Sequence, residues 1–293
     1  MTVRPLPTAL AEKARKELNE DPELIDEKIQ QFKQWILSQK HLKARTDDQW
    51  LLAFLRGCKY RMEQAKSKID LYYSLRSTAP YLYSVKFNES KLIDLLNLGS
   101  VVILPKTLNP AEPRIIFYRL GRFDPKEYHI IDVLCLLSFM EQICFMEDDT
   151  FVVAGTIHVL DFAGTKFGHY TQTSFTHLRH IGVARQDAVP IRIKRIHFLN
   201  TPYFFETFFK VAKMILSEKN KQRILFHSKS ALHDYFPKEV IPEEYGGTGD
   251  SFRQCVDYWK NKIREYNSFF EEDLKYGSDE SKRLTKNESI EFD

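Results

Sequence analysis

Residues 190–228 constrain the fold most, because they predict a strand, a helix and a second strand joined by short links. The outer pieces, PIRIKRIHFLN and RILFHS, are rich in Ile, Leu and Phe, which favour strands. The middle piece, TPYFFETFFKVAKMIL, predicts one helix with Thr201 as N-cap and Pro202 at its first position. A strand-helix-strand unit of this kind is typical of a parallel sheet with right-handed crossovers.

The predicted middle helix is apolar over most of its circumference, and Glu206, Lys210 and Lys213 leave only a narrow polar stripe. Such a helix needs more than one apolar neighbour: a core, a bound lipid or a membrane. Between residues 185 and 229 there are ten Lys/Arg and three acids, so this segment carries +7 while the whole chain carries +3. An apolar helix flanked by cations is typical of a surface that meets anionic lipid. A buried helix between two surface strands is the alternative.

The alternation of strands and helices extends to both sides of this segment. Strands are predicted at 114–121 and 155–164, and helices at 128–147 and 171–186. A short helix capped by Ser230 follows, and a closing helix at 251–272 begins with a capping box of Ser251 and Gln254. The sequence therefore predicts an α/β fold with a mostly parallel sheet, and the segment EEYGG is expected to end that sheet.

The first hundred residues predict helices instead. One helix covers about 21–39, a second is preceded by a capping box of Thr46 and Gln49 and ends at Gly57, and a third covers about 62–76. We therefore divide the chain into a helical module (1–97), an α/β domain (98–250) and a C-terminal helix with an acidic tail (251–293). Beyond the helix, this tail is expected to be frayed.

A search for chemical motifs finds no GxGxxG, no GxxxxGK[ST], no GxSxG and no HExxH. His177 and His180 lie three apart on a predicted helix, but no carboxylate follows nearby to complete a metal set, and surface or capping roles are expected. Asp161 ends a strand without a second acid or base beside it, so a structural role in the next turn is expected. Neither a catalytic group, a metal nor a cofactor is predicted.

No signal peptide or membrane span is predicted either. The N-terminal twenty residues lack an apolar stretch, and the longest apolar run, 130–146, is too short and too polar to cross a bilayer. The four cysteines fit no metal spacing and are expected to be free thiols. The small net charge gives no general attraction to nucleic acid. The sequence thus favours a cytoplasmic protein.

Four stretches resemble the CRAL-TRIO lipid-transfer family, in the group of alpha-tocopherol transfer protein and cellular retinaldehyde-binding protein, and look like an arthropod member of it. They are DDQWLLAFLRGCKYRMEQAKSKIDLYYSLR, VAGTIHVLDFAG, PIRIKRIHFLNTP with the Phe-rich helix, and PKEVIPEEYGG, in the family's order over residues 47–247. The resemblance implies a non-enzymatic protein, a helical N-terminal module, and an α/β domain that encloses one lipophilic molecule. It also implies that the Phe-rich helix is a mobile gate that opens at membranes.

The resemblance further implies that basic residues hold phosphoinositide headgroups, and the matching positions here are Arg192, Lys194, Lys219 and Arg223. Arg192 and Lys194 are two apart on a strand and would share a face, which suits a phosphate group. Lys219 and Arg223 are four apart and would share a face of a helix. A solvated charged rim is the alternative. Relatives carry one more basic residue where this chain has Cys58, with Lys59 beside it.

The predicted ligand cavity is lined by apolar side chains of the 128–147 helix, the strands, the segments between them and the gate. These are Leu134, Leu137, Met140, Leu160, Ile181, Val189, Ile191, Ile196, Phe204, Phe205 and Phe208. The side chains expected to enter a membrane are Phe204, Phe205, Phe208, Phe209 and Val211. Tocopherol, retinoid, carotenoid, sterol and phospholipid all remain possible ligands, because an apolar pocket selects mainly by volume and shape. We expect a monomer.

Two other classes of function remain open. One is a phosphoinositide-sensing adaptor without cargo, whose cavity would be small or filled by side chains. The other is a hydrolase on a similar scaffold, which would need a nucleophile beside a base in a cleft.

Overall fold

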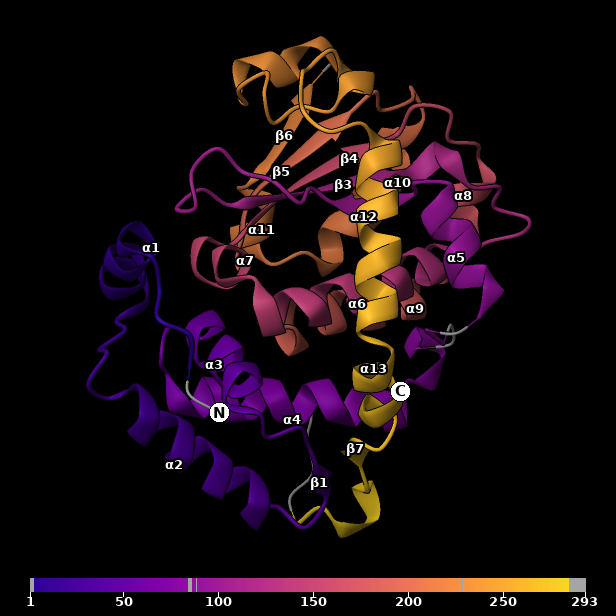
Figure 1. The fold of residues 1–293 in the computed structure, drawn as a ribbon. Coiled ribbons are helices and arrows are strands. Elements are labelled where there is room, and N and C mark those ends of the chain that lie inside the picture. The colour runs from indigo at the N-terminus through magenta and orange to yellow at the C-terminus, as the bar shows by residue number, and fades with distance from the viewer. Residues whose placement is uncertain (1–2, 84–85, 88, 228, 285–293) are drawn as a thin grey trace.

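The computed structural model describes residues 3–83, 86–87, 89–227 and 229–284 (Figure 1). Its first part consists of helical elements: α1 (Thr8–Lys13), η1 (Ala14–Leu18), α2 (Ile25–Ser38), α3 (Asp48–Gly57), α4 (Met62–Thr78), η2 (Pro80–Tyr83) and α5 (Ser90–Asn97). Helices of the second part are α6 (Ile130–Glu147), α7 (Asp149–Ala154), α8 (Gly168–Thr171), α9 (Phe175–Val183), α10 (Phe205–Ile215), α11 (Glu218–Lys221), α12 (Phe252–Glu265) and α13 (Asn267–Asp273). A helical part followed by an α/β part agrees with the predicted fold class.

Within the described residues, a five-stranded sheet has the order β2-β3-β4-β5-β6. Its strands are β2 (Val101–Ile103), β3 (Arg114–Arg119), β4 (Thr156–Asp161), β5 (Ile193–Leu199) and β6 (Ile224–His227). The edge strand β2 is antiparallel to β3, and the other neighbours are parallel. Because neighbouring parallel strands follow in chain order, right-handed crossovers put α6, α9 and α10 on the same face of the sheet.

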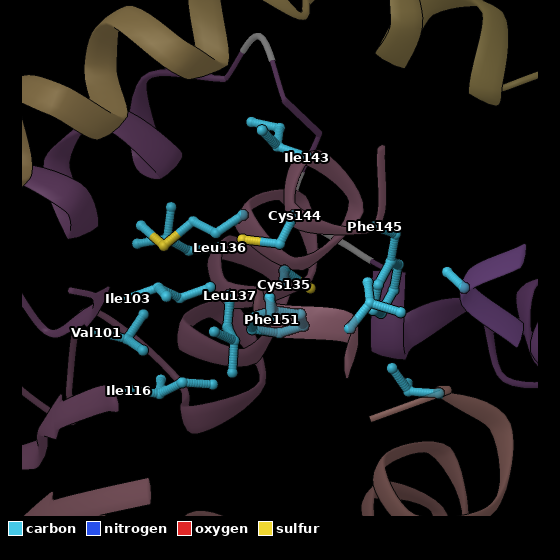
Figure 2. Packing of buried hydrophobic residues seen from close by; sticks show 14 of the residues in the cluster. Val101, Ile103, Ile116, Cys135, Leu136, Leu137, Ile143, Cys144, Phe145 and Phe151 are labelled. Atoms are coloured by element: carbon cyan, nitrogen blue, oxygen red, sulfur yellow. The ribbon is translucent and has the colours of Figure 1, made fainter. Parts of the chain in front are cut away.

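Helix α6 fills the centre of that face because it is apolar almost all round. Figure 2 shows its side chains leaving in several directions, with Leu137 near Ile116 of β3 and Phe145 toward the helical part. Phe145 packs edge-on to Trp50 of α3, with ring centroids 5.7 Å apart. One continuous core therefore joins the helical part to the α/β part.

A buried ion cluster also joins the two parts. The guanidinium of Arg56, at the end of α3, donates to both oxygens of Glu20 at 2.8 and 2.9 Å and to Asp149 at 3.0 Å. The next residue, Gly57, allows a close approach, because a Cβ there would lie 2.4 Å from the carbonyl oxygen of Pro190. The end of α3 thus rests on the chain that enters β5.

The predicted start of the Phe-rich helix is wrong by three residues. Helix α10 begins at Phe205 with Phe204 as N-cap, and Thr201 and Pro202 precede it in a turn closed by the Phe205 amide on the Pro202 carbonyl at 2.9 Å. Asn200 has a left-handed φ of 52°, so the chain leaves β5 through a turn before a helix can start.

The capping box predicted at Thr46 is also wrong. Helix α3 starts at Asp48 with Asp47 as N-cap and without a side-chain cap, because Gln49 instead donates to Asp149 at 3.4 Å. The capping box of Ser251 and Gln254 is confirmed.

Several helices predicted in the second half of the chain have different boundaries in the structure. The 171–186 helix is divided into α9 and a π-helical turn, η4 (Ala184–Ala188), and the short helix after β6 is a 3-10 turn, η5 (Lys229–Asp234). The 251–272 helix divides into α12 and α13. The prediction of a frayed tail is wrong up to residue 284, because β7 (Gly277–Ser278) pairs with β1 (Leu42–Lys43) and Arg283 binds Asp70 at 2.6 Å. The last nine residues of the tail lie outside the described residues.

Candidate functional site: a basic cleft beside an aromatic gate

A cleft of about 1050 Å³ lies between the helical part and the start of β5. Its walls come from the α3–α4 connection and α4, from η4, from the residues that enter β5, and from the α11 turn. Gly57 lies close to Pro190, and this contact fixes the distance between the α3–α4 connection and the residues that enter β5. Segments that are more than 100 residues apart in the sequence therefore face one another here.

The cleft is strongly basic. Among the described side chains that line it, nine are Lys or Arg and three are Asp or Glu, so its formal charge is +6. The basic residues are Lys59, Arg61, Lys68, Arg185, Arg192, Lys194, Lys219, Arg223 and Arg283. A concave surface with this charge concentrates anions.

Some of these cations already have partners within the protein. The ammonium of Lys194 donates to Glu17 of η1 at 2.7 Å, and Arg192 lies 3.8 Å from the same carboxylate and donates to the Val153 carbonyl. Lys68 donates to three carbonyls, those of Gln186, Asp187 and Val189. Glu17 thus pairs with both cations on the β5 side of the cleft.

For three other cations of the cleft, Lys59, Lys219 and Arg223, the side-chain nitrogens have no hydrogen-bond or ion-pair partner within the described part of the chain. Burial, and then the neighbouring cations Arg223 and Lys59, lower the pKa of the Lys219 ammonium. Burial likewise lowers the pKa of Arg223. Cations that repel one another in a cleft are stabilised by an anion that binds between them.

The four residues implied to hold a headgroup all line this cleft: Arg192, Lys194, Lys219 and Arg223. Lys219 lies in α11, and the turn continues to Arg223, whose amide donates to the Asn220 carbonyl at 3.0 Å. The sequence did not identify Arg61 and Lys68, which reach the cleft from the helical part. Cys58 also lines the cleft, and burial raises the pKa of its thiol.

A second space lies between α6, η2, α9 and η4. It is a small, partly open pocket of about 40 Å³, which we call the internal cavity. Its walls are mostly apolar, but Ser138, Glu141, Gln142 and Arg185 also reach it. Arg185 lines both this cavity and the basic cleft, so the two spaces adjoin each other.

The inner face of α10 closes the sheet by aromatic packing. Phe205 and Phe209 lie against Phe198 of β5 and Phe162 after β4, with Phe162 and Phe205 centroids 4.6 Å apart. Ile196 completes this cluster, and each of the five side chains is at most 8% exposed. We call these five residues the gate cluster.

The outer face of α10 carries exposed apolar side chains beside the charged Glu206, Lys210 and Lys213. Met214 is 73% exposed and Val211 38%, and Tyr203, just before the helix, is 98% exposed. Phe167, ahead of α8, adds a ring that is 61% exposed and lies 5.5 Å from that of Phe208. The sequence did not identify Tyr203 or Phe167 as part of this surface, although both are large apolar side chains beside loops.

The predicted cavity residues are distributed over five places. Leu134, Ile181 and Val189 line the internal cavity; Leu160, Ile196 and Phe205 belong to the gate cluster or pack against it; Ile191 lines the basic cleft; Leu137 and Met140 are fully buried in the main core. The half-buried Phe204 and Phe208 pack on Tyr170 at the rim of α10. Of the residues expected to enter a membrane, Phe205 and Phe209 lie under the helix and Val211 lies on its outside.

The two histidines of α9 pack on η2. The ring of Tyr81 lies 4.5 Å from that of His177, and its hydroxyl contacts His180. No group of three metal-ligating side chains occurs among the described residues. Nor does any helix among those residues have the length and hydropathy needed to cross a membrane.

Comparisons with known proteins agree with this arrangement. The model of the CRAL/TRIO domain matches residues 99–247, and that of the Pinta-like UBA domain matches residues 21–89. The alpha-tocopherol transfer protein-like protein of Mus musculus is 31% identical over 245 residues, which cover 82% of this chain and 70% of that protein. Clavesin-2 of Rattus norvegicus is 28% identical over 267 residues, covering 87% of this chain and 81% of that protein.

The fold is also found among solved structures. The crystal structure of Sfh5 matches with a TM-score of 0.50 at 12% identity, covering 90% of this chain and all of that one. At this identity the match concerns the fold alone. Because the domain model spans half of the chain and a relative above 30% identity covers most of it, the chain belongs to the CRAL/TRIO family.

Proposed function

We propose that the protein is a non-enzymatic carrier that binds one small hydrophobic ligand and exchanges it at membranes containing phosphoinositides. The observation that carries this proposal is that a basic cleft and an exposed apolar helix face are linked by the short β5–α10–α11 segment. A cytoplasmic monomer that associates only transiently with membranes would use both surfaces. The name of one relative, the alpha-tocopherol transfer protein-like protein, supports tocopherol as a cargo, and retinoids and carotenoids are other lipophilic candidates.

The physical roles of the two surfaces differ. The side chains of Lys59, Lys219 and Arg223 form no ion pair with any residue that the structure describes, so an inositol phosphate group would neutralise them without breaking one of the described ion pairs. Met214 and Tyr203 would enter the lipid tails, since a membrane anchor of this type combines apolar insertion with attraction to anionic lipid. The gate cluster could then separate without exposing its rings to water.

The experiment compares vesicles of phosphatidylcholine that contain either phosphatidylinositol bisphosphate or phosphatidylserine at equal total charge. The variant Lys219→Ala/Arg223→Ala should lose about 2 kcal/mol, or about 30-fold, in binding to the phosphoinositide vesicles. The control Lys40→Ala/Lys106→Ala removes the same charge from exposed positions outside the cleft. Equal losses in both variants would show that binding depends only on the overall charge of the protein. No loss in either variant would contradict the proposal.

A second candidate is a phosphoinositide-sensing adaptor without cargo, and the size of the internal cavity favours it. At about 40 Å³, the cavity is far smaller than the roughly 300–1,000 Å³ of typical ligand sites. A carrier must therefore move α10 or its neighbours before it can take up a lipid. Saturable uptake of a fluorescent tocopherol, retinoid or phospholipid analogue at one molecule per chain would favour the carrier, and no uptake of any of them would favour the adaptor.

A further inference from the structure

The internal cavity contains a buried polar group without a partner. The side-chain oxygen of Gln142 is buried and accepts no hydrogen bond, and among the described side chains that bound the cavity it alone has such an atom. The residue as a whole is 4% exposed. A buried acceptor left in this way costs about 1–3 kcal/mol. The cost is recovered if a group that donates a hydrogen bond binds beside it.

The same wall of the cavity holds a neutral ion pair. The two terminal guanidinium nitrogens of Arg185, Nη1 and Nη2, donate to the carboxylate of Glu141, and the Nη1 bond measures 2.6 Å. Burial alone would lower the pKa of Arg185, but Glu141 holds that pKa above its ordinary value, so the pair stays ionised. Breaking a buried pair of this kind is expensive, because the remaining charge is uncompensated.

These two features restrict the polar end of a ligand. A carboxylate or an ammonium beside Gln142 would lose its hydration without gaining a counter-ion, because the charges of Glu141 and Arg185 are already paired with each other. A hydroxyl group carries no charge and both donates and accepts hydrogen bonds. The cavity of about 40 Å³ is also close to the roughly 30 Å³ that one water molecule occupies, so it can receive a hydroxyl before the surroundings move.

We propose that Gln142 binds the hydroxyl end of a long-chain lipid alcohol and that the Glu141–Arg185 pair excludes charged ends. This inference rests on the proposed carrier function and names the chemical class of its cargo. The hydrocarbon chain would occupy the volume that opens when the apolar neighbours of the cavity separate. Gln142 and Glu141 thus determine specificity, while the apolar walls supply most of the affinity.

The test uses three branched twenty-carbon probes that differ only at one end: phytol, phytanic acid and phytane. Native mass spectrometry of the full chain gives their relative affinities at neutral pH. Wild type should prefer phytol to phytane and to phytanic acid by about fivefold or more. Gln142→Met keeps the length of the side chain and should remove the preference over phytane. Gln31→Met makes the same change at an exposed site of α2 and should leave all three affinities unchanged.

Glu141→Gln provides a second, charge-switching test. It leaves Arg185 without its counter-ion, so the preference should move toward phytanic acid by about tenfold or more relative to phytol, even if Gln142→Met does not fold. Equal binding of the three probes to wild type and to Gln142→Met would mean that Gln142 holds only a buried water, and would overturn the inference while the carrier function stands. If wild type binds none of the probes and no tocopherol analogue, the carrier function fails as well.

Discussion

The aromatic gate cluster should control how fast a ligand leaves the protein in water. Moving α10 off the sheet would expose five side chains that are now at most 8% exposed. Each contributes about 1.5–3 kcal/mol when buried, so full exposure of all five costs about 8–15 kcal/mol. At tenfold per 1.4 kcal/mol, fewer than about one molecule in a million would be open. Spontaneous release in water should therefore be very slow.

Phe209→Ala tests this reasoning at a member of the cluster that lies on α10 itself. Phe209 packs on Phe198, Phe205 and Phe226, with centroids 5.3–5.4 Å away. Removing its ring lowers the cost of opening by about 1.5–3 kcal/mol, so the release rate should rise about 10- to 150-fold. The assay loads the protein with a fluorescent tocopherol analogue and follows its transfer to a soluble cyclodextrin, without vesicles.

Met214→Ala is the matched control, because it shortens an apolar side chain on the outer face of the same helix. Release into cyclodextrin should stay unchanged, while transfer to acceptor vesicles should slow, because less apolar surface enters the bilayer. Urea unfolding of each variant shows whether it is folded under the assay conditions. A folded Phe209→Ala protein whose release rises less than about threefold would refute the assignment of α10 as the barrier.

Three further results are expected. Glu17→Gln removes the carboxylate that pairs with cations on the β5 side of the cleft, so binding to phosphoinositide vesicles should strengthen about fivefold in a sedimentation assay, and weaker binding would contradict the geometry. Arg56→Met leaves the buried Glu20 without its cation and removes one of the two cations paired with Asp149, so it should cost about 3–5 kcal/mol in urea unfolding. Arg4→Ala removes the exposed second cation of Asp149 and should cost less than about 1 kcal/mol; similar losses would argue against a buried network. Burial, and then a neighbouring histidine, lower the pKa of His197 to about 4, so the unfolded chain takes up a proton between about pH 6.5 and 4 that the folded chain refuses. The free energy of unfolding should therefore decrease as the pH falls from about 6.5 to about 4, and it should decrease less in His197→Gln than in wild type.

The sequence predicts those parts of the fold that local patterns determine. The strands at β3, β4 and β5 and the helix α6 follow from runs of apolar residues, and the cap at Ser251 follows from a four-residue motif. The errors occur where tertiary contacts choose between local alternatives. Gln49 could cap α3, but it binds Asp149 instead, and Asn200 adopts a left-handed turn that delays α10.

The sequence predicted only the part of the basic cleft that residues 192–223 supply. Spacing suggested that Arg192 and Lys194 share a face, as well as Lys219 and Arg223, but it could not bring the two pairs together. Lys59, Arg61 and Lys68 reach the cleft from the helical part, and Glu17 of η1 pairs with Lys194. These contacts depend on packing between distant segments, and helical periodicity alone could not tell which Phe residues of α10 face the sheet.

The aspartate predicted to be structural also explains where the gate can pivot. Asp161, at the end of β4, accepts from the Ala163 amide at 2.9 Å, as expected for a residue that caps the next turn. The same carboxylate accepts from the Asn200 side chain at 2.7 Å and from the Tyr245 hydroxyl at 2.5 Å. The residue that leaves β5 is therefore fixed to the neighbouring strand and to the turn that follows the sheet. In the proposed carrier, movement of α10 is therefore expected to begin beyond this anchor, in the turn at Thr201 and Pro202, so that the gate cluster separates while the sheet and the basic cleft keep their geometry.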